Sequence, residues 1–168
     1  AKSAHKKNRI GILGGSFNPI HHGHLLMAQA ALNGMKLDKV IFVPAHCSPH
    51  KIDRDLAPAK HRLAMARLAA RDQKNFIVSD LEIKRGGVSY AVDTAGYFRG
   101  RYPKDQLFFI IGEDSIKGLR DWKNIDGILS ILSFIAVNRE CCPVSSSQIR
   151  RRLSCKQSIQ GLTPAAVI

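Results

Sequence analysis

Acidic residues are scarce in this sequence. Its 168 residues include 13 Asp and Glu against 26 Lys and Arg, which gives a formal net charge of +13 at pH 7 with the histidines neutral. A basic surplus of this size attracts phosphate, whether on a nucleic acid, an anionic membrane or a nucleotide. Charge alone does not choose among these three ligands.

Long apolar runs are also missing. The most apolar stretch, residues 128–137, is broken by Ser130 and Ser133, and it is far shorter than the roughly 20 residues that a membrane-spanning helix needs. The apolar run near the N-terminus ends at Gly14, before the hydrophobic part of a signal peptide could form. We therefore expect no membrane association and a cytoplasmic protein.

Cysteine is sparse and lacks a metal-binding pattern. The four cysteines, Cys47, Cys141, Cys142 and Cys155, form neither a C-x-x-C pair nor a zinc-ribbon spacing. We expect reduced, structural thiols, while a redox function of the adjacent Cys141 and Cys142 stays open at this stage.

The remaining composition is typical of one folded domain. With 45% hydrophobic and 23% charged residues, the chain can bury a core, and disorder is excluded. No repeat, low-complexity tract or long linker divides it. We expect a single domain over residues 1–168, with residues 1–8 as a disordered basic tail.

Strand and helix patterns alternate along the chain. Short β-branched or aliphatic runs predict buried parallel strands over residues 9–13, 39–43, 76–79, 107–111 and 133–137. Apolar residues at three- and four-residue spacing predict helices over residues 22–32, 59–70, 91–99, 124–132 and 147–153. Within the second helix, the spacing groups Leu68 with the apolar face and Arg62 with the polar one. This order predicts an α/β fold, a doubly wound (Rossmann-like) parallel sheet with helices on both faces.

The densest cluster of functional residues lies between the first strand and the first helix. Residues 14–24 read Gly-Gly-Ser-Phe-Asn-Pro-Ile-His-His-Gly-His. Adjacent glycines let the backbone approach a ligand closely, and the helix N-terminus offers unpaired N–H groups. The string predicts a phosphate site, although it matches neither the G-x-G-x-x-G nor the Walker pattern.

His21 and His24 are three residues apart, which places both imidazoles on one face of the first helical turn. Helix capping or half-buried packing is one alternative. A metal site is another, but it would need a carboxylate or a third histidine, and none lies nearby in the sequence. Beside the glycines we favour phosphate binding, and we expect no protein-bound metal.

The same string resembles the G-G-[ST]-F-[DN]-P-x-H-x-G-H motif of the H-x-G-H nucleotidyltransferase superfamily, and within it the bacterial nicotinate-nucleotide adenylyltransferases. Four further segments resemble motifs of that family in the expected order. They are Val43-Pro44 with Ser48-Pro49-His50-Lys51, Ser89-Tyr90-Ala91-Val92-Asp93-Thr94, Ile110-Ile111-Gly112-Glu113-Asp114 with Leu119 and Trp122, and Val144-Ser145-Ser146-Ser147-Gln148-Ile149-Arg150. Any one string could arise by chance, but five in register are highly specific.

The resemblance implies an enzyme that transfers the adenylyl group of ATP to nicotinate mononucleotide, giving deamido-NAD and pyrophosphate. It implies direct in-line attack, with Mg²⁺ brought by ATP. Catalytic roles would fall on His21, His24, Lys51 and Arg150. Binding of substrate and ATP would fall on Gly14, Gly15, Ser16, Phe17, Asn18, Ser89, Tyr90, Ala91, Asp114, Trp122, Ser146 and Ser147.

Individual roles also follow from the resemblance, and those of Asp114 and Trp122 have a structural alternative. Asp114 would accept hydrogen bonds from ribose hydroxyls, or it could cap the next helix. Trp122 would stack on the pyridine ring, or it could simply pack. The backbone N–H groups around Tyr90 and Ala91 would meet the nicotinate carboxylate. Arg150 would hold the β- and γ-phosphates of ATP, since hydroxyls, N–H groups and a guanidinium converge at the start of its helix.

Two segments depart from the family pattern. Relatives carry a longer segment with a further strand before the serine motif, whereas only residues 139–144 intervene here. Relatives also continue with a terminal helix, so we expect the C-terminal helix to be cut short.

Two rival functions remain. A related adenylyl- or cytidylyltransferase would act on another phosphate acceptor. A basic nucleic-acid-binding module would need aromatic residues on a basic face, yet the aromatics here lie mostly in strand or motif positions. We expect ATP and nicotinate mononucleotide as partners and no nucleic acid, while a homo-oligomer stays open.

Overall fold

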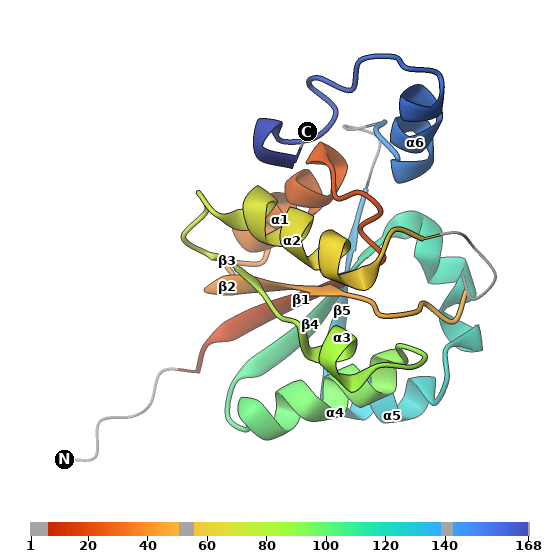
Figure 1. Ribbon diagram of the computed structural model, residues 1–168. Coiled ribbons are helices and arrows are strands. Elements are labelled where there is room, and N and C mark those ends of the chain that lie inside the picture. Colours follow the sequence, from red (N-terminus) through yellow and green to blue (C-terminus); the bar gives the residue numbers. More distant parts are fainter. Residues whose placement is uncertain (1–6, 51–55, 139–142, 168) are drawn as a thin grey trace.

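The structure, a computed structural model, describes residues 7–50, 56–138 and 143–167. Within these residues five parallel strands form one sheet (Figure 1). They are β1 (Arg9–Gly15), β2 (Lys39–Pro44), β3 (Phe76–Val78), β4 (Gln106–Gly112) and β5 (Ser133–Val137), in the order β3-β2-β1-β4-β5. The central strands β1, β2 and β4 are largely buried because helices cover both faces.

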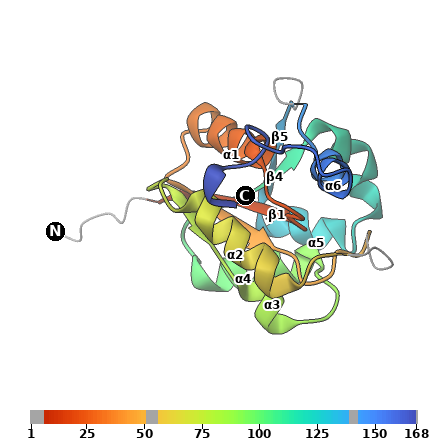
Figure 2. The ribbon, with the colours of Figure 1, turned by 45° about the horizontal axis from the view of Figure 1, so that its top comes forward.

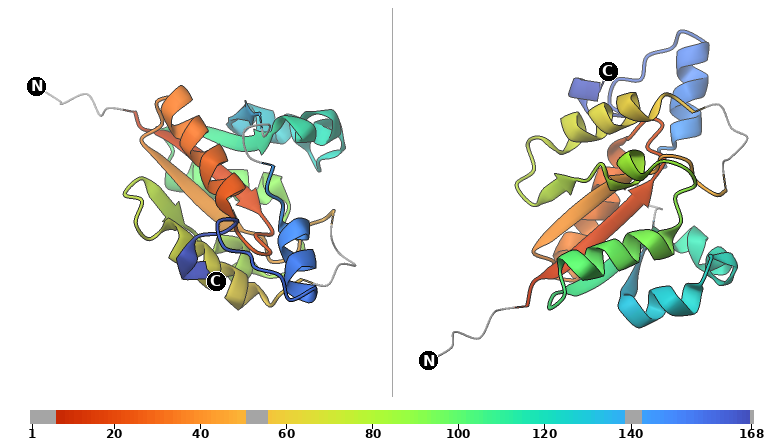
Figure 3. Two further views of the ribbon diagram at one scale, coloured as in Figure 1. Left: turned by 90° about the horizontal axis from the view of Figure 1, so that it is seen from above. Right: turned by 60° about the horizontal axis from the view of Figure 1, so that its bottom comes forward.

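Each face of the sheet has its own helices and its own core (Figures 1 and 3). On one face, α1 (His22–Gly34) and α2 (Ala59–Ala70) pack over a cluster that contains Leu13. On the other, α4 (Ala91–Arg101) and α5 (Ile125–Ile131) pack over a cluster that contains Ile12. Successive side chains of a strand point to opposite faces, so β1 supplies both cores. The predicted doubly wound, Rossmann-like α/β fold is confirmed.

The strand order places a switch point between β1 and β4. From β1 the chain proceeds outward through β2 to β3, and it then returns to the other side of β1 to form β4 and β5. The connections therefore leave the carboxyl ends of β1 and β4 in opposite directions, which opens a crevice there. The glycines that end these two strands, Gly15 and Gly112, lie at the entrance to the connecting loops.

Most element boundaries match the sequence prediction to within two residues. Three short elements were not predicted: α3 (Leu81–Arg85) and the 3₁₀ helices η1 (Glu113–Asp121) and η2 (Ala165–Val167). The periodic pattern misses them because none presents a sustained apolar face. After α6 (Ser146–Ser154) the described chain forms turns and η2. The expectations for Lys51, Cys141 and Cys142 lie outside the described residues, and so do residues 1–6.

The described helices are all too short or too polar to cross a membrane. The two cysteines that the structure describes, Cys47 and Cys155, are free thiols.

The predicted disordered tail extends too far. Asn8 is part of the fold, because its backbone N–H and its side-chain amide donate to Asp105 Oδ1 at 2.9 and 3.3 Å. Its carbonyl accepts from the N–H of Gln106 at 2.9 Å, which continues the pairing of β1 with β4.

The polar assignment of Arg62 is wrong. Its side chain is 1% exposed, whereas Leu68 is 39% exposed. The guanidinium donates to four backbone carbonyls, those of Ser16 (2.7 Å), Ala45 (2.6 Å), His46 (2.9 Å) and Ala57 (2.8 Å). A periodic pattern counts arginine as polar, but a fork of five donors fits a place where several carbonyls lack partners. Burial lowers the pKa of this guanidinium.

The C-terminal segment closes over the start of α1 (Figure 2). The backbone N–H of His22 donates to the carbonyl of Leu162 at 3.1 Å, and Thr163 Oγ1 donates to the carbonyl of Ile20 at 2.9 Å. Residues about 140 positions apart along the chain therefore fix the entry into α1.

We predict that Arg62→Ala lowers the free energy of unfolding by about 3 kcal/mol or more, because it leaves several buried carbonyls without a donor. Urea denaturation measures this change. Arg67→Ala on the same helix is the control: this side chain is 56% exposed and pairs with Asp80 at 3.2 Å, so its loss should cost less than about 1 kcal/mol. Equal losses in the two variants would contradict the structural importance of Arg62.

Candidate active site

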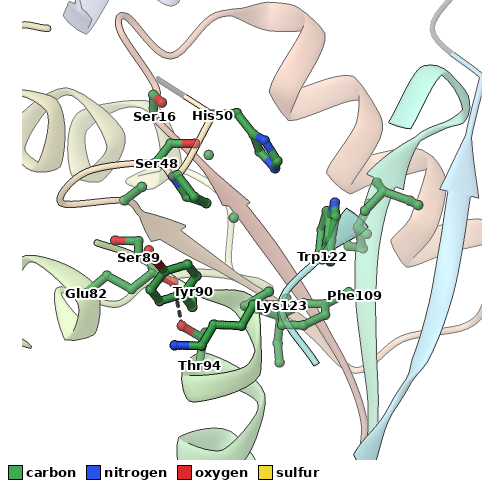
Figure 4. A pocket seen from close by; sticks show the side chains of 18 of the residues that line it. Ser16, Ser48, His50, Glu82, Ser89, Tyr90, Thr94, Phe109, Trp122 and Lys123 are labelled. Carbon is green, nitrogen blue, oxygen red and sulfur yellow. Dashed lines mark hydrogen bonds between the residues drawn. The ribbon is translucent and has the colours of Figure 1, made fainter. Parts of the chain in front are cut away.

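A pocket of about 290 Å³ opens at the carboxyl ends of β1 and β4. Its walls come from β1, from residues 45–50, from the start of α4, from β4 and from residues 121–123. The pocket brings together seven of the predicted binding residues: Gly14, Gly15, Ser16, Ser89, Tyr90, Ala91 and Trp122. In Figure 4, Trp122 stands across the pocket from Ser48 and Tyr90.

The glycine end of the pocket is shaped for a close ligand. A Cβ atom added at Gly14 would meet no protein atom within 4 Å, so this glycine leaves room beside the backbone. Ser16 is 6% exposed, and its buried hydroxyl forms no hydrogen bond with the described part of the chain. A buried hydroxyl of this kind indicates a missing partner, because unsatisfied buried polar groups are costly.

The turn between β1 and α1 has its carbonyl oxygens occupied by side-chain donors. Arg62 binds the carbonyl of Ser16, and Arg150 Nη1 binds that of Asn18 at 2.6 Å. Ser146 Oγ donates to the carbonyl of Pro19 at 2.9 Å. These partly negative oxygens thus bind donors of the protein, which leaves them less able to repel an anion at the turn.

The two motif histidines form one unit at the start of α1. His21 is the N-cap, in extended conformation, one position before the first helical turn where it was expected. The two rings stack at 3.8 Å between centroids. The backbone N–H of His21 donates to His24 Nδ1 at 3.2 Å. The capping interaction and a ligand-facing role are compatible, because a neutral His24 that accepts at Nδ1 carries its proton on Nε2 as a donor.

Gly23 explains the spacing of this motif. A Cβ atom at this position would lie 2.9 Å from His21 Cε1 and 3.3 Å from the carbonyl oxygen of Val144. The glycine thus allows the His21 ring and the segment before α6 to pack against the helix.

The other end of the pocket is the N-terminus of α4. Its N-cap is Tyr90, whose side chain makes no capping hydrogen bond. The first N–H groups of a helix have no partner within the helix and carry the positive end of its dipole. The Lys123 ammonium lies over the Tyr90 ring, 4.1 Å from its centroid. This end of the pocket is therefore suited to an anionic group.

Trp122 lines the same pocket while its ring packs on two phenylalanines. Its centroid lies 6.5 Å from that of Phe109 and 5.8 Å from that of Phe134, both in T-shaped contacts. Packing and ligand contact thus coexist at this residue, because the indole has a second, pocket-lining side.

Several predicted site residues lie outside this pocket's lining. The Phe17 side chain is 1% exposed and belongs to the core, against Phe42 and the edge of His24. Asp114 is exposed in the first turn of η1. Arg150 Nη2 donates to Ser147 Oγ at 3.1 Å. These contacts around the serine motif hold the turn that follows β1.

Sequence reasoning missed Glu82, which lines the pocket from α3 and is 6% exposed. Burial raises the pKa of this carboxyl group, and Asp93 adds to the rise. Hydrogen bonds from Thr94 and Ser89 and the charge of Arg85 oppose it. A signal was present, because a single glutamate between Leu81 and Ile83 interrupts apolar neighbours, but it lies outside the segments compared with family motifs.

The family model described as cytidylyltransferase-like matches residues 12–152, which include both ends of the pocket. The fold and the pocket are therefore those of a cytidylyltransferase-like protein.

Individual relatives narrow the class. The chain is 38% identical over 175 residues to the nicotinate-nucleotide adenylyltransferase of Bacillus subtilis, covering 95% of this chain and 93% of that protein. It is 45% identical over 139 residues to a probable nicotinate-nucleotide adenylyltransferase of Citrifermentans bemidjiense, covering 82% of this chain and 64% of the relative's length. The structure of the Plasmodium falciparum nicotinic acid mononucleotide adenylyltransferase complexed with NaAD shares the fold, with a TM-score of 0.75, 19% identity, and coverage of 96% of this chain and 93% of that one.

The chain therefore belongs to the cytidylyltransferase-like family and, within it, to the nicotinate-nucleotide adenylyltransferases.

We predict a pH-dependent stability difference between the parent protein and Glu82→Gln. A raised pKa means that the folded state holds the proton more tightly than the unfolded state. This contribution to stability is fully present below the ordinary value of 4.5 and is lost as the pH rises through the raised pKa. The parent should lose up to about 1.4 kcal/mol per pH unit relative to Glu82→Gln over that interval. Urea denaturation of both proteins at a series of pH values up to neutrality measures the difference in their free energies of unfolding. A difference that does not change with pH would contradict the raised pKa of Glu82.

Proposed function

We propose that this protein transfers the adenylyl group of ATP to nicotinate mononucleotide, giving deamido-NAD and pyrophosphate, a step of NAD synthesis. One observation carries the proposal: a single pocket joins a glycine turn with an unsatisfied Ser16 hydroxyl to a helix N-terminus, and Trp122 faces that N-terminus across the pocket. The first end suits phosphates, and the second suits an aromatic ring bearing a carboxylate.

The reaction needs no nucleophile from the protein. An oxygen of the mononucleotide 5′-phosphate attacks the α-phosphorus of ATP, and the bond from that phosphorus to the bridging oxygen breaks. Pyrophosphate leaves with the electron pair. Catalysis then consists of holding the two substrates in line and stabilising charge on the bridging oxygen.

His24 is the residue we assign to the reacting phosphates. With its Nδ1 accepting from the His21 N–H, a neutral His24 carries its proton on Nε2, a donor of the kind that a phosphate oxygen accepts. His21 fixes the orientation of that ring by stacking. The amides of residues 14–16 complete this end, and the carbonyls around them are already bound by Arg62, Arg150 and Ser146.

Further contacts to ATP extend the same proposal. Lys51 and Arg150 would reach phosphate oxygens, the latter from its place beside Asn18 and Ser147. Asp114 would accept from ribose hydroxyls at the carboxyl end of β4. Mg²⁺ enters with ATP and is held mainly by phosphate oxygens and water, and it supplies charge neutralisation. The proposal places the enzyme in the cytoplasm.

The first test is pyrophosphate release from MgATP with a panel of acceptors. Nicotinate mononucleotide should be preferred over nicotinamide mononucleotide by roughly tenfold or more in kcat/KM. A charge-assisted hydrogen bond from the α4 amides to a carboxylate contributes about 1.5–3 kcal/mol, and about 1.4 kcal/mol corresponds to a factor of ten. Equal turnover of the two would contradict the acid-binding role of α4, and turnover only with another phosphate would overturn the proposed acceptor.

The second test separates catalysis from binding at His24. The imidazole should interact more strongly as charge moves to the leaving pyrophosphate, so His24→Ala should lose on the order of 10²–10³ in kcat. Its KM should change less. His22→Ala is the matched control, because His22 lies two residues before His24 and off the face that His21 and His24 share. In the hydrogen bonds described above, only its backbone takes part, in the bond to Leu162.

Steady-state rates give the comparison, with circular dichroism as a check on folding. Loss of activity in His22→Ala equal to that in His24→Ala would show that the assignment of His24 is wrong.

A further inference from the structure

The buried carboxylate of Glu82 is the end point of a hydrogen-bond chain. Thr94 Oγ1 donates to Glu82 Oε1 at 2.5 Å (Figure 4). Ser89 is buried as well, and its hydroxyl favours the charged form of this carboxyl group and so lowers its pKa. The same Ser89 Oγ accepts from the backbone N–H of His46 at 3.0 Å. Since Ser89 Oγ accepts from His46, its hydroxyl proton remains for an acceptor such as Glu82.

A glycine turn precedes Ser89. Gly86 and Gly87 both adopt positive φ, at 70° and 66°, so two consecutive residues use a conformation that favours glycine. The segment is attached to residues 46 and 47 by two further hydrogen bonds. The Ser89 N–H donates to the carbonyl of Cys47 at 2.7 Å, and His46 Nδ1 lies 3.0 Å from the carbonyl oxygen of Gly87.

Glu82 adds a connection that the backbone cannot supply. It links the residue just before the N-cap of α4, Ser89, to the first turns of that helix through Thr94. The direction of the first α4 amides relative to the pocket therefore depends on the position of one carboxylate. Glutamine has the same size, but its amide nitrogen cannot accept a hydrogen bond from a hydroxyl, so only one of its two terminal atoms is an acceptor.

We infer that Glu82 is a positioning residue for the acceptor end of the site: by holding Ser89 and Thr94, it aims the N-terminal amides of α4 at the carboxylate of the acceptor. This inference rests on the proposed function. It assigns no contact between Glu82 and the substrate. Its effect should be confined to the acceptor, because the turn that follows β1 is held by other residues, Arg62, Arg150 and Ser146.

The test measures KM for both substrates in variants of this chain of hydrogen bonds. Glu82→Gln and Thr94→Val should raise KM for nicotinate mononucleotide about tenfold, as expected for losing hydrogen bonds to a charged group. KM for ATP and kcat should change less than about twofold, which is within the effect of a neutral surface substitution. Thr94→Ser keeps the hydroxyl and should restore the parental acceptor KM. Lys84→Gln, on the exposed side of α3, is the matched control.

Amide hydrogen exchange of the free protein gives a second readout that needs no substrate. Exchange should rise in residues 89–94 of Glu82→Gln and stay at the parental level in residues 14–18. An unchanged acceptor KM in an active variant, or equal increases in both KM values, would overturn the positioning role. If the parent itself does not use nicotinate mononucleotide, the proposed function fails, and parental exchange in residues 89–94 of Glu82→Gln would overturn the inference separately.

Discussion

A single buried guanidinium joins the loops from which the site is made. Arg62 binds carbonyls in the turn after β1, in the loop after β2 and just before α2. Its hydrogen-bond partners among the described residues are backbone carbonyls, whose dipoles stabilise the charge. A buried charge without such partners would be strongly destabilising. The carbonyls of the loops therefore stabilise the buried charge of Arg62, and Arg62 in turn holds the loops together. The glycine turn depends on these hydrogen bonds for its conformation.

Hydrogen bonds from side chains to backbone carbonyls also surround the turn that follows β1. Its carbonyls are bound by donors from α2, from α6 and from the C-terminal segment, at Arg62, Arg150, Ser146 and Thr163. The partial negative charges of the turn thus face the protein, which leaves a local environment in which phosphate is not repelled. Several motif residues serve an anion site in this indirect way. Ser146 and Arg150, which the family resemblance assigns to ligand, also build the turn itself.

The sheet, its order of elements and one face of the site were accessible from sequence, because buried parallel strands and the glycine-histidine string carry strong local signals. The burial of Arg62 was not, since it depends on carbonyls that meet only in the folded chain. Glu82 was missed for the same reason: its partners Ser89 and Thr94 are defined by the turn at Gly86 and Gly87. Phe17 shows the converse, because a residue inside a functional motif has its side chain in the core.

The contact between Thr163 and Ile20 bears on how the enzyme matures during synthesis. The glycine turn leaves the ribosome some 140 residues ahead of Leu162 and Thr163. Pairings of such separation form late, because loop closure must precede them. The entry into α1 therefore acquires these two contacts only after residues 162 and 163 have been synthesised.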